Sequence, residues 1–217
     1  MAEFVSIEED KFEKKTTYQT SKGLNLSETC ETIIIGGDFK LYLRRINVMP
    51  DNDTLVFDVH SECDNWFFLR QGKMIILVDG ETIELEPHES YAHTANDGVI
   101  KCVESDFYCL SKELLEKICR SSSFAMRIYG KNSSIEIANN NAVVVFCKLF
   151  YNAVYDGSMY QDVVDNCISQ FTDYFGDINK FESINLDGSG AKGGCMGMLA
   201  LLLTLGGAAI GGVCSLI

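Results

Sequence analysis

Residues 193–217 carry no charged side chain, and this feature divides the chain into two parts that must fold in different surroundings. Within this segment, residues 196–217 form a run of 22 uncharged residues. A helix of that length spans roughly 33 Å at about 1.5 Å per residue, which is enough for a bilayer core. We therefore predict a membrane-spanning or membrane-inserting helix at 196–217. The alternative is a hydrophobic hairpin folded into an oligomer.

The remainder of the chain is strongly acidic. All 18 Lys and Arg and all 31 Asp and Glu lie in residues 1–192, so the formal net charge of −13 belongs to that part. Nucleic-acid binding and electrostatic docking on anionic lipid both need clustered cations, and the charge balance argues against both functions. The 47% of hydrophobic residues and the 2 prolines exclude a disordered chain.

The cysteines and the N-terminus indicate a reducing compartment. There are 9 cysteines at irregular spacing with no CxxC pair, so they do not form a disulfide framework. The first ten residues are acidic where a signal peptide needs positive charge and an apolar run. Lys180 and Lys192 precede the apolar tail and nothing positive follows it. This asymmetry predicts a single-pass, tail-anchored membrane protein with its N-terminal domain in the cytoplasm.

Short apolar segments separated by turn residues predict an α+β fold in residues 31–180, with an antiparallel β meander and packed helices. Asp79-Gly80 lies between two apolar runs and predicts a tight hairpin, because this pair tolerates positive φ. Residues 1–30 are polar without a sustained period and predict a loose arm. The expected strands are 32–35, 39–48, 54–60, 66–69, 73–78, 81–85, 91–95, 99–104, 124–129 and 134–138.

Three helices are expected, at about 111–120, 140–155 and 159–175, followed by a Gly-rich linker at 181–195. Ser111 is a natural N-cap for the first helix. The second helix is apolar nearly all round and should be deeply buried, although three consecutive valines leave a strand as the alternative for Val143–Cys147. The third helix has one apolar stripe opposite an acidic face, which is typical of packing on a core.

Small residues recur at every fourth position of the apolar tail. Such spacing lets two helix backbones approach closely in a membrane, so the tail predicts self-association into a homo-oligomer. The residues concerned are Gly207, Gly211 and Ser215, with Ala208 and Gly212 beside them.

Two other interpretations of the tail stay open. Cys214-Ser-Leu-Ile resembles a prenylation box, but Ser215 is not aliphatic and no polybasic region precedes it. Gly193-Gly194 resembles the double-glycine junction of exported peptides, although the upstream 194 residues would be an unusually long leader.

The sequence contains no recognisable catalytic or cofactor motif, and we predict no catalytic residue, metal or cofactor. Asp58, His60 and Glu62 would share one face of a strand and Cys63 the other, which favours a solvated strand face over a metal site. His88 and His93 are five residues apart, a poor ligand spacing.

An aromatic cluster supplies the candidate ligand or partner face. On a strand, Trp66 and Phe68 would share one side. Such a side most often belongs to the core, and a ligand or partner face at Trp66 and Phe68 is the alternative.

A family resemblance rests on structural motifs. Residues 64–69 and 73–85, followed by Phe107-Tyr108, residues 111–115 and residues 126–131, resemble a class of uncharacterised bacterial β-rich domains over about residues 30–155. These domains are similar to small PH-like barrels, so the resemblance implies a barrel-like fold without catalytic residues. The chain lacks the basic loops that phosphoinositide recognition would require.

Together these features predict a non-enzymatic, membrane-anchored binding or scaffolding protein with an acidic cytoplasmic head, an unknown protein partner and a self-associating tail. The alternatives are a membrane-active effector whose tail inserts or permeabilises on triggering, and the precursor of a double-glycine-type exported hydrophobic peptide.

Overall fold

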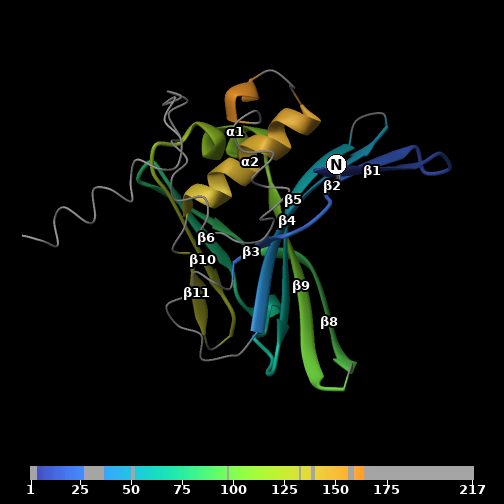
Figure 1. Cartoon of the computed structure of the whole chain (residues 1–217), viewed down its shortest axis with the longest axis vertical. Coiled ribbons are helices and arrows are strands. Elements are labelled where there is room, and N and C mark those ends of the chain that lie inside the picture. Colours follow the sequence, from blue (N-terminus) through green and yellow to red (C-terminus); the bar gives the residue numbers. More distant parts are fainter. Residues whose placement is uncertain are drawn as a thin grey trace, which may run out of the picture.

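The computed structural model describes residues 4–26, 37–49, 52–96, 98–131, 133–137, 140–155 and 159–163. Its antiparallel strands form two sheets, and helices α1 (Lys112–Arg120) and α2 (Asn140–Val154) lie together across one end of them (Figure 1). The β-rich α+β class predicted from the sequence is therefore confirmed. The strands are divided between two sheets instead of forming one continuous meander.

The larger sheet has seven strands in the order β1-β2-β4-β5-β9-β8, with β3 paired to β4. Neighbouring strands along this order run antiparallel. Its long central strands β4 and β5 pair over their whole length, from Gly37 opposite Cys63 to Val48 opposite Asn52. The strands are β1 (Val5–Asp10), β2 (Lys15–Thr20), β3 (Leu24–Asn25), β4 (Gly37–Val48), β5 (Asn52–Cys63), β8 (Pro87–Asn96) and β9 (Ile100–Leu110).

The smaller sheet has four strands in the order β11-β10-β6-β7. Its hairpin between β6 and β7 turns at Asp79 (φ 48°) and Gly80 (φ 86°), so the predicted Asp-Gly turn is confirmed. Asp79 Oδ1 also accepts hydrogen bonds from the backbone amides of Ser122 and Ser123 at 2.9 and 3.0 Å, which joins this turn to the end of α1. The strands are β6 (Met74–Val78), β7 (Glu81–Leu85), β10 (Phe124–Tyr129) and β11 (Ser134–Glu136).

Two predicted elements were wrong. The described residues 4–26 are not a loose arm, because they form β1, β2 and β3 of the larger sheet. Residues 66–68 are not a strand: they form an irregular segment that leads into the short 3₁₀ helix η2 (Leu69–Gln71), with Phe68 in the left-handed region at φ 61°. An L residue at that φ ends strand pairing locally, whatever its apolar character.

Helix α1 confirms the predicted cap, because Ser111 Oγ accepts a hydrogen bond from the backbone amide of Leu114 at 3.0 Å. Helix α2 confirms the predicted burial. Its described residues from Ala142 to Asn152 are all buried, and it is a helix through Val143–Cys147, which removes the strand alternative.

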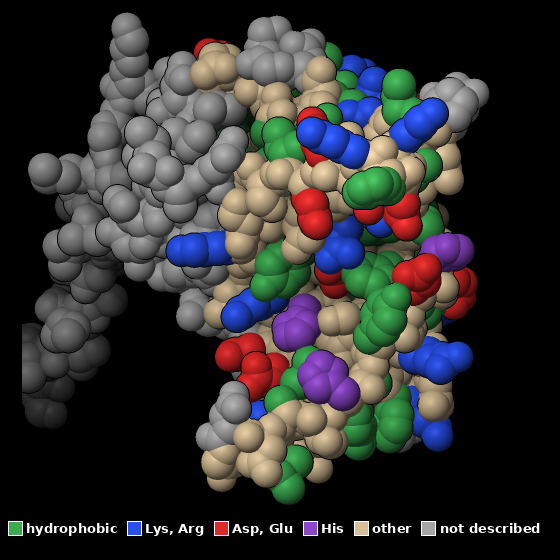
Figure 2. Space-filling model, turned by 90° about the vertical axis from the view of Figure 1, so that its right-hand side faces the viewer, with side chains coloured by type: hydrophobic (Ala, Val, Ile, Leu, Met, Phe, Trp, Pro, Cys, Tyr) green, Lys and Arg blue, Asp and Glu red, His purple; other side chains and the backbone are tan. Residues whose placement is uncertain are grey.

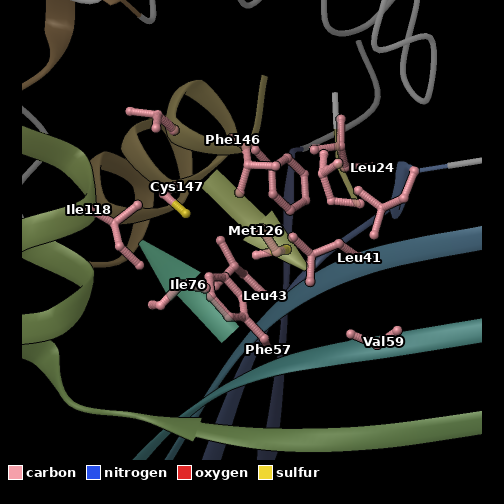
Figure 3. Close-up of a cluster of buried hydrophobic side chains, with 14 of the residues drawn as sticks. Leu24, Leu41, Leu43, Phe57, Val59, Ile76, Ile118, Met126, Phe146 and Cys147 are labelled. Atoms are coloured by element: carbon pink, nitrogen blue, oxygen red, sulfur yellow. The ribbon is translucent and has the colours of Figure 1, made fainter. Parts of the chain in front are cut away.

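The core lies where α2 meets both sheets. Phe146 and Cys147 of α2 are drawn next to Leu24 and Leu41 of the larger sheet and Met126 of the smaller one (Figure 3). All five side chains are at most 1% exposed. One apolar helix therefore holds the two sheets against each other.

The C-terminal end of α2 is fastened to the larger sheet by Arg45 on β4. The guanidinium donates to the Val154 carbonyl at 3.2 Å and to Asp53 Oδ1 at 2.8 Å. It also lies 4.3 Å from the centroid of the Tyr155 ring. A cation beside the last carbonyls of a helix satisfies a group that has no intrahelical partner.

Several predicted segments lie outside the described residues. These are the strand at 32–35, most of the helix at 159–175, the linker at 181–195 and the tail at 196–217 with Gly207, Ala208, Gly211, Gly212 and Ser215. Gln161–Val163 are helical, in agreement with the start of the predicted third helix. Of the helices that can be described, none has the length and apolar character needed to cross a bilayer.

Replacing Phe146 by alanine should lower the free energy of unfolding by about 3–5 kcal/mol, because a fully buried ring leaves a cavity between the sheets. Chemical denaturation followed by circular dichroism measures the change. Ala153→Ser, at an exposed position of the same helix, is the matched control and should change stability by less than about 1 kcal/mol. Equal stability of the two variants would contradict the central place of α2.

Candidate functional site

An open groove lies at the start of β8, beside η2. Its volume is about 390 Å³, and its lining is mostly polar. Because the lining residues come from η2 and from the first half of β8, the groove opens along the free edge of the larger sheet. They are Arg70, Pro87, His88, Glu89, Ser90 and Tyr91.

Behind this groove, the inner face of β9 carries a row of buried polar side chains. Glu104, Asp106 and Tyr108 alternate along the strand and are 5%, 1% and 0% exposed. Ser61 on β5 lies directly opposite Glu104 and is also buried. Acidic residues are rarely so buried, and each must be explained by what it contacts.

Glu104 positions η2. Its Oε1 accepts a hydrogen bond from the Phe68 amide at 3.0 Å, and its Oε2 accepts one from the Leu69 amide at 3.1 Å. These bonds hold the left-handed turn at Phe68 and fix the following residue, Arg70, beside the groove. Hydrogen bonds between a carboxylate and backbone amides are among the stronger ones in proteins, so Glu104 is the anchor of this corner.

Asp106 lies between the anchor and the groove. Burial raises the pKa of its carboxyl to about 6; a hydrogen bond from Ser90 opposes the shift, Glu104 adds to it, and Arg70 opposes it. Its Oδ2, together with the Tyr108 hydroxyl and Ser61 Oγ, has no hydrogen-bond partner within the described residues. The inner face of β9 therefore carries buried polar side chains where the hydrophobic core ends.

The outer face of the same strands carries a histidine–serine pair. His60 Nδ1 lies 2.8 Å from Ser105 Oγ, and burial and the charge of Lys40 lower the pKa of the imidazole. Of the two carboxylates on the same strand face, Asp58 is paired with Arg44 at 3.0 Å, and Glu62 acts on the imidazole through its charge without a hydrogen bond to it. A serine nucleophile needs a base that a third group orients, and the described part of the chain supplies none for His60.

Asp58 is buried in this outer face although it has a charged partner. Burial raises the pKa of its carboxyl to about 6, Arg44 opposes the shift, and the charge of Asp106 on the neighbouring strand adds to it. Arg44 also lies over the Phe107 ring at 5.1 Å from its centroid. The Arg44–Asp58 ion pair is therefore a packed, structural part of the outer face of the sheet.

Metal and thiol chemistry find no support in the described ranges. No group of three or more His, Cys, Asp or Glu side chains there could hold a metal ion. Cys63 lies opposite Cys102, but both thiols are reduced and buried. Burial raises the pKa of Cys63 to about 12 and also raises that of Cys102, which makes both poor nucleophiles.

Seen from the side of β8 and the β1–β2 hairpin, histidine, acidic, basic and hydrophobic side chains are interspersed, and no single kind forms a broad patch (Figure 2). This view excludes an extended basic or apolar surface on that side of the described protein.

The structure does not bring Trp66 and Phe68 together on one strand face. Trp66 is half-buried, while Phe68 is exposed at 38% and has the Lys131 ammonium 5.7 Å from its ring centroid. Phe67 between them points into the core and packs edge-on against Phe39 at 5.1 Å. Phe68 directly precedes η2, and this is its connection to the groove.

Strand β8 lies at one end of the larger sheet. It pairs with β9 on one side, and no described strand pairs with its other side (Figure 1). Most of its side chains are exposed, including Tyr91 at 60%. Sequence reasoning placed a strand at 91–95 but could not place it at an edge, because the order of strands in a sheet is a tertiary property.

Comparisons of the chain with protein-family models, with curated proteins and with solved structures give no match. The resemblance to PH-like bacterial domains therefore stays a prediction.

The raised pKa of Asp106 makes stability depend on pH. The folded protein holds a proton that the unfolded chain releases between about pH 4 and pH 6, so this carboxyl lowers stability as pH rises through that window. Relative to wild type, Asp106→Asn should therefore gain about 2 kcal/mol of unfolding free energy between pH 4 and pH 7.

Urea denaturation at pH 4, 5, 6 and 7 measures this difference. Glu9→Gln, at an exposed position of β1, is the control and should follow the wild-type profile. A profile of Asp106→Asn parallel to that of wild type would disprove the assignment.

Proposed function

We propose that this protein is a non-enzymatic binding protein, held at a membrane by residues 196–217, that takes up an extended segment of a partner protein along the free edge of β8. The observation that carries the proposal is that, among the described residues, no strand pairs with the outer side of β8. An exposed strand edge presents unpaired backbone N–H and C=O groups, which form a ready template for one more strand.

The four outer strands of the two sheets differ in how they are protected. β1 carries Glu8, Glu9 and Asp10 in succession, and β11 is only three residues long. β7 has five residues, two of them glutamates. Charge and shortness are the devices by which native proteins prevent pairing at an edge.

β8 has neither device over most of its length. It is ten residues long, and its register irregularity is confined to the step between Pro87 and Glu89. The seven residues from Ser90 to Asn96 include no proline and no Asp, Glu, Lys or Arg. An edge of this kind favours either aggregation or a specific partner, and a specific partner is the use that selection would retain.

Within the described residues, the His60–Ser105 pair has no third group that orients the imidazole, and the pKa values of Cys63 and Cys102 are raised, which is why the proposal is one of binding. The membrane part of the proposal rests on sequence alone, on the 22 uncharged residues that end the chain. The small residues Gly207, Gly211 and Ser215 would bring several heads together, which suits a scaffold.

Membrane attachment is tested by fractionation. The full chain should stay in the membrane pellet after washing with alkaline carbonate, and deletion of residues 193–217 should release it. Leu205→Arg places a charge near the middle of the span, which costs about 3 kcal/mol, and should shift protein toward the supernatant. Recovery of the unaltered full chain in the supernatant would reject an integral span.

Strand addition is tested by two neighbouring proline variants, Ala92→Pro and His93→Pro. Successive residues of a strand direct their N–H groups to opposite sides, so one proline meets the free edge and the other disrupts pairing with β9. The proline that faces the free edge leaves the pairing with β9 intact, so it gives the more stable of the two variants. In selections from displayed ten-residue peptides rich in β-branched residues, this variant should fail to enrich peptides, whereas wild type enriches them.

Phe68→Ala is the comparison variant for the aromatic cluster, because the Phe68 side chain is exposed at the start of η2 and Phe68 forms no part of the β8 ladder. It should retain wild-type enrichment. Loss of enrichment in Phe68→Ala with full enrichment in both proline variants would move the binding surface to the aromatic cluster and contradict strand addition.

A further inference from the structure

The first half of β8 places a carboxylate and an aromatic ring side by side. Glu89 and Tyr91 pair with Phe107 and Ser105 of β9, and both are exposed on the outer side of the sheet. The Tyr91 hydroxyl donates to Glu89 Oε2 at 3.4 Å, so the carboxylate and the ring lie next to each other at the mouth of the groove.

The charges near this position are mixed, and the cation opposite Glu89, Arg44 over the Phe107 ring, is already paired with Asp58. Glu86 and Glu89 are exposed beside the groove, and Asp106 lies behind Ser90. Arg70 is the cation of the groove lining, and its charge acts on Asp106. Lys101, farther along β9, is already paired with Asp64 at 2.5 Å. Among the described residues, no Lys or Arg forms an ion pair with Glu89, so its carboxylate can accept a cation from a partner.

We propose that the segment taken up along β8 is basic, and that one of its Arg or Lys side chains lies in the groove between the Glu89 carboxylate and the Tyr91 ring. This inference rests on the proposed function and specifies the chemistry of its partner. A carboxylate next to an exposed aromatic ring offers a cation both an ion pair and a cation–π contact. The backbone ladder supplies the pairing, and the groove selects the side chain.

The same charges disfavour two other occupants. A second copy of this chain would add another β8, which has no Lys or Arg, so it would supply no cation to Glu89. An acidic segment would meet Glu86 and Glu89 without enough cation to offset them. Like charges across an interface oppose the approach of such partners.

The test uses the full chain in detergent micelles and four synthetic ten-residue peptides. Three share one alternating Thr/Val sequence with Arg, Gln or Glu at the same three same-face positions, and the fourth has the sequence of residues 87–96. At low salt the Arg peptide should bind about fivefold more tightly than the Gln peptide, and the Glu peptide most weakly. The advantage of Arg should fade at about 0.5 M salt.

Glu89→Gln should bring the affinities of the Arg and Gln peptides within about twofold of each other without abolishing binding. Glu9→Gln on β1 is the matched control and should keep the full preference for Arg. Loss of the preference for Arg in Glu89→Gln, together with its retention in Glu9→Gln, would support the proposal.

The possible results distinguish a failure of the basic preference from a failure of strand addition. Equal binding of the Arg, Gln and Glu peptides, abolished by the proline variant that faces the free edge, would overturn the basic preference and leave strand addition standing. Tightest binding by the peptide of residues 87–96 would overturn it in favour of a second copy of the chain. Binding by no peptide would overturn both the preference and the proposed function.

Discussion

The fold depends on the burial of α2. A helix that is apolar nearly all round cannot lie on a surface, and α2 packs against α1 and both sheets. The sheets share no strand, and Phe146 of α2 packs with facing side chains of both sheets, such as Leu43 and Ile76, in one core. Arg45 then fixes the end of the helix to the hairpin of β4 and β5. Removing these contacts would leave two sheets of marginal stability.

The candidate site forms where this core ends. η2 packs on β8 and β9, and its turn is held by the carboxylate of Glu104 in addition to the buried Leu69 side chain. The inner face of β9 can therefore carry Asp106 and Tyr108, and β8 can extend away from the body of the protein (Figure 1). Burying a carboxyl group costs free energy. These carboxyl groups are buried here because they shape the groove beside the free edge.

The parts that the sequence predicted correctly are those with local causes. The turn at Asp79-Gly80 follows from backbone conformational preference, the cap at Ser111 from one side-chain hydrogen bond, and the burial of α2 from its composition. β1 and β2 were missed because their polar residues become a strand pair only through long-range pairing with β4. The segment at Trp66 was misjudged because its hydrophobicity hid the left-handed residue at Phe68.

The site itself was largely beyond sequence reasoning. Glu104 and Asp106 look like solvated charges in the sequence, and their burial follows from which strands flank β9. The uncharged run from Ser90 to Asn96 was visible, but its meaning depends on β8 being the last strand of the sheet. Trp66 and Phe68, which composition favoured, lie in an irregular segment and share no strand face.

The most direct test of the central claim, that β8 receives an added strand, is amide hydrogen exchange along β8 with and without a bound basic peptide. Exchange should slow at alternate residues between Ser90 and Asn96, because only every second N–H faces the free edge. Unchanged exchange along β8 with protection gained around Trp66 and Phe68 would contradict the claim.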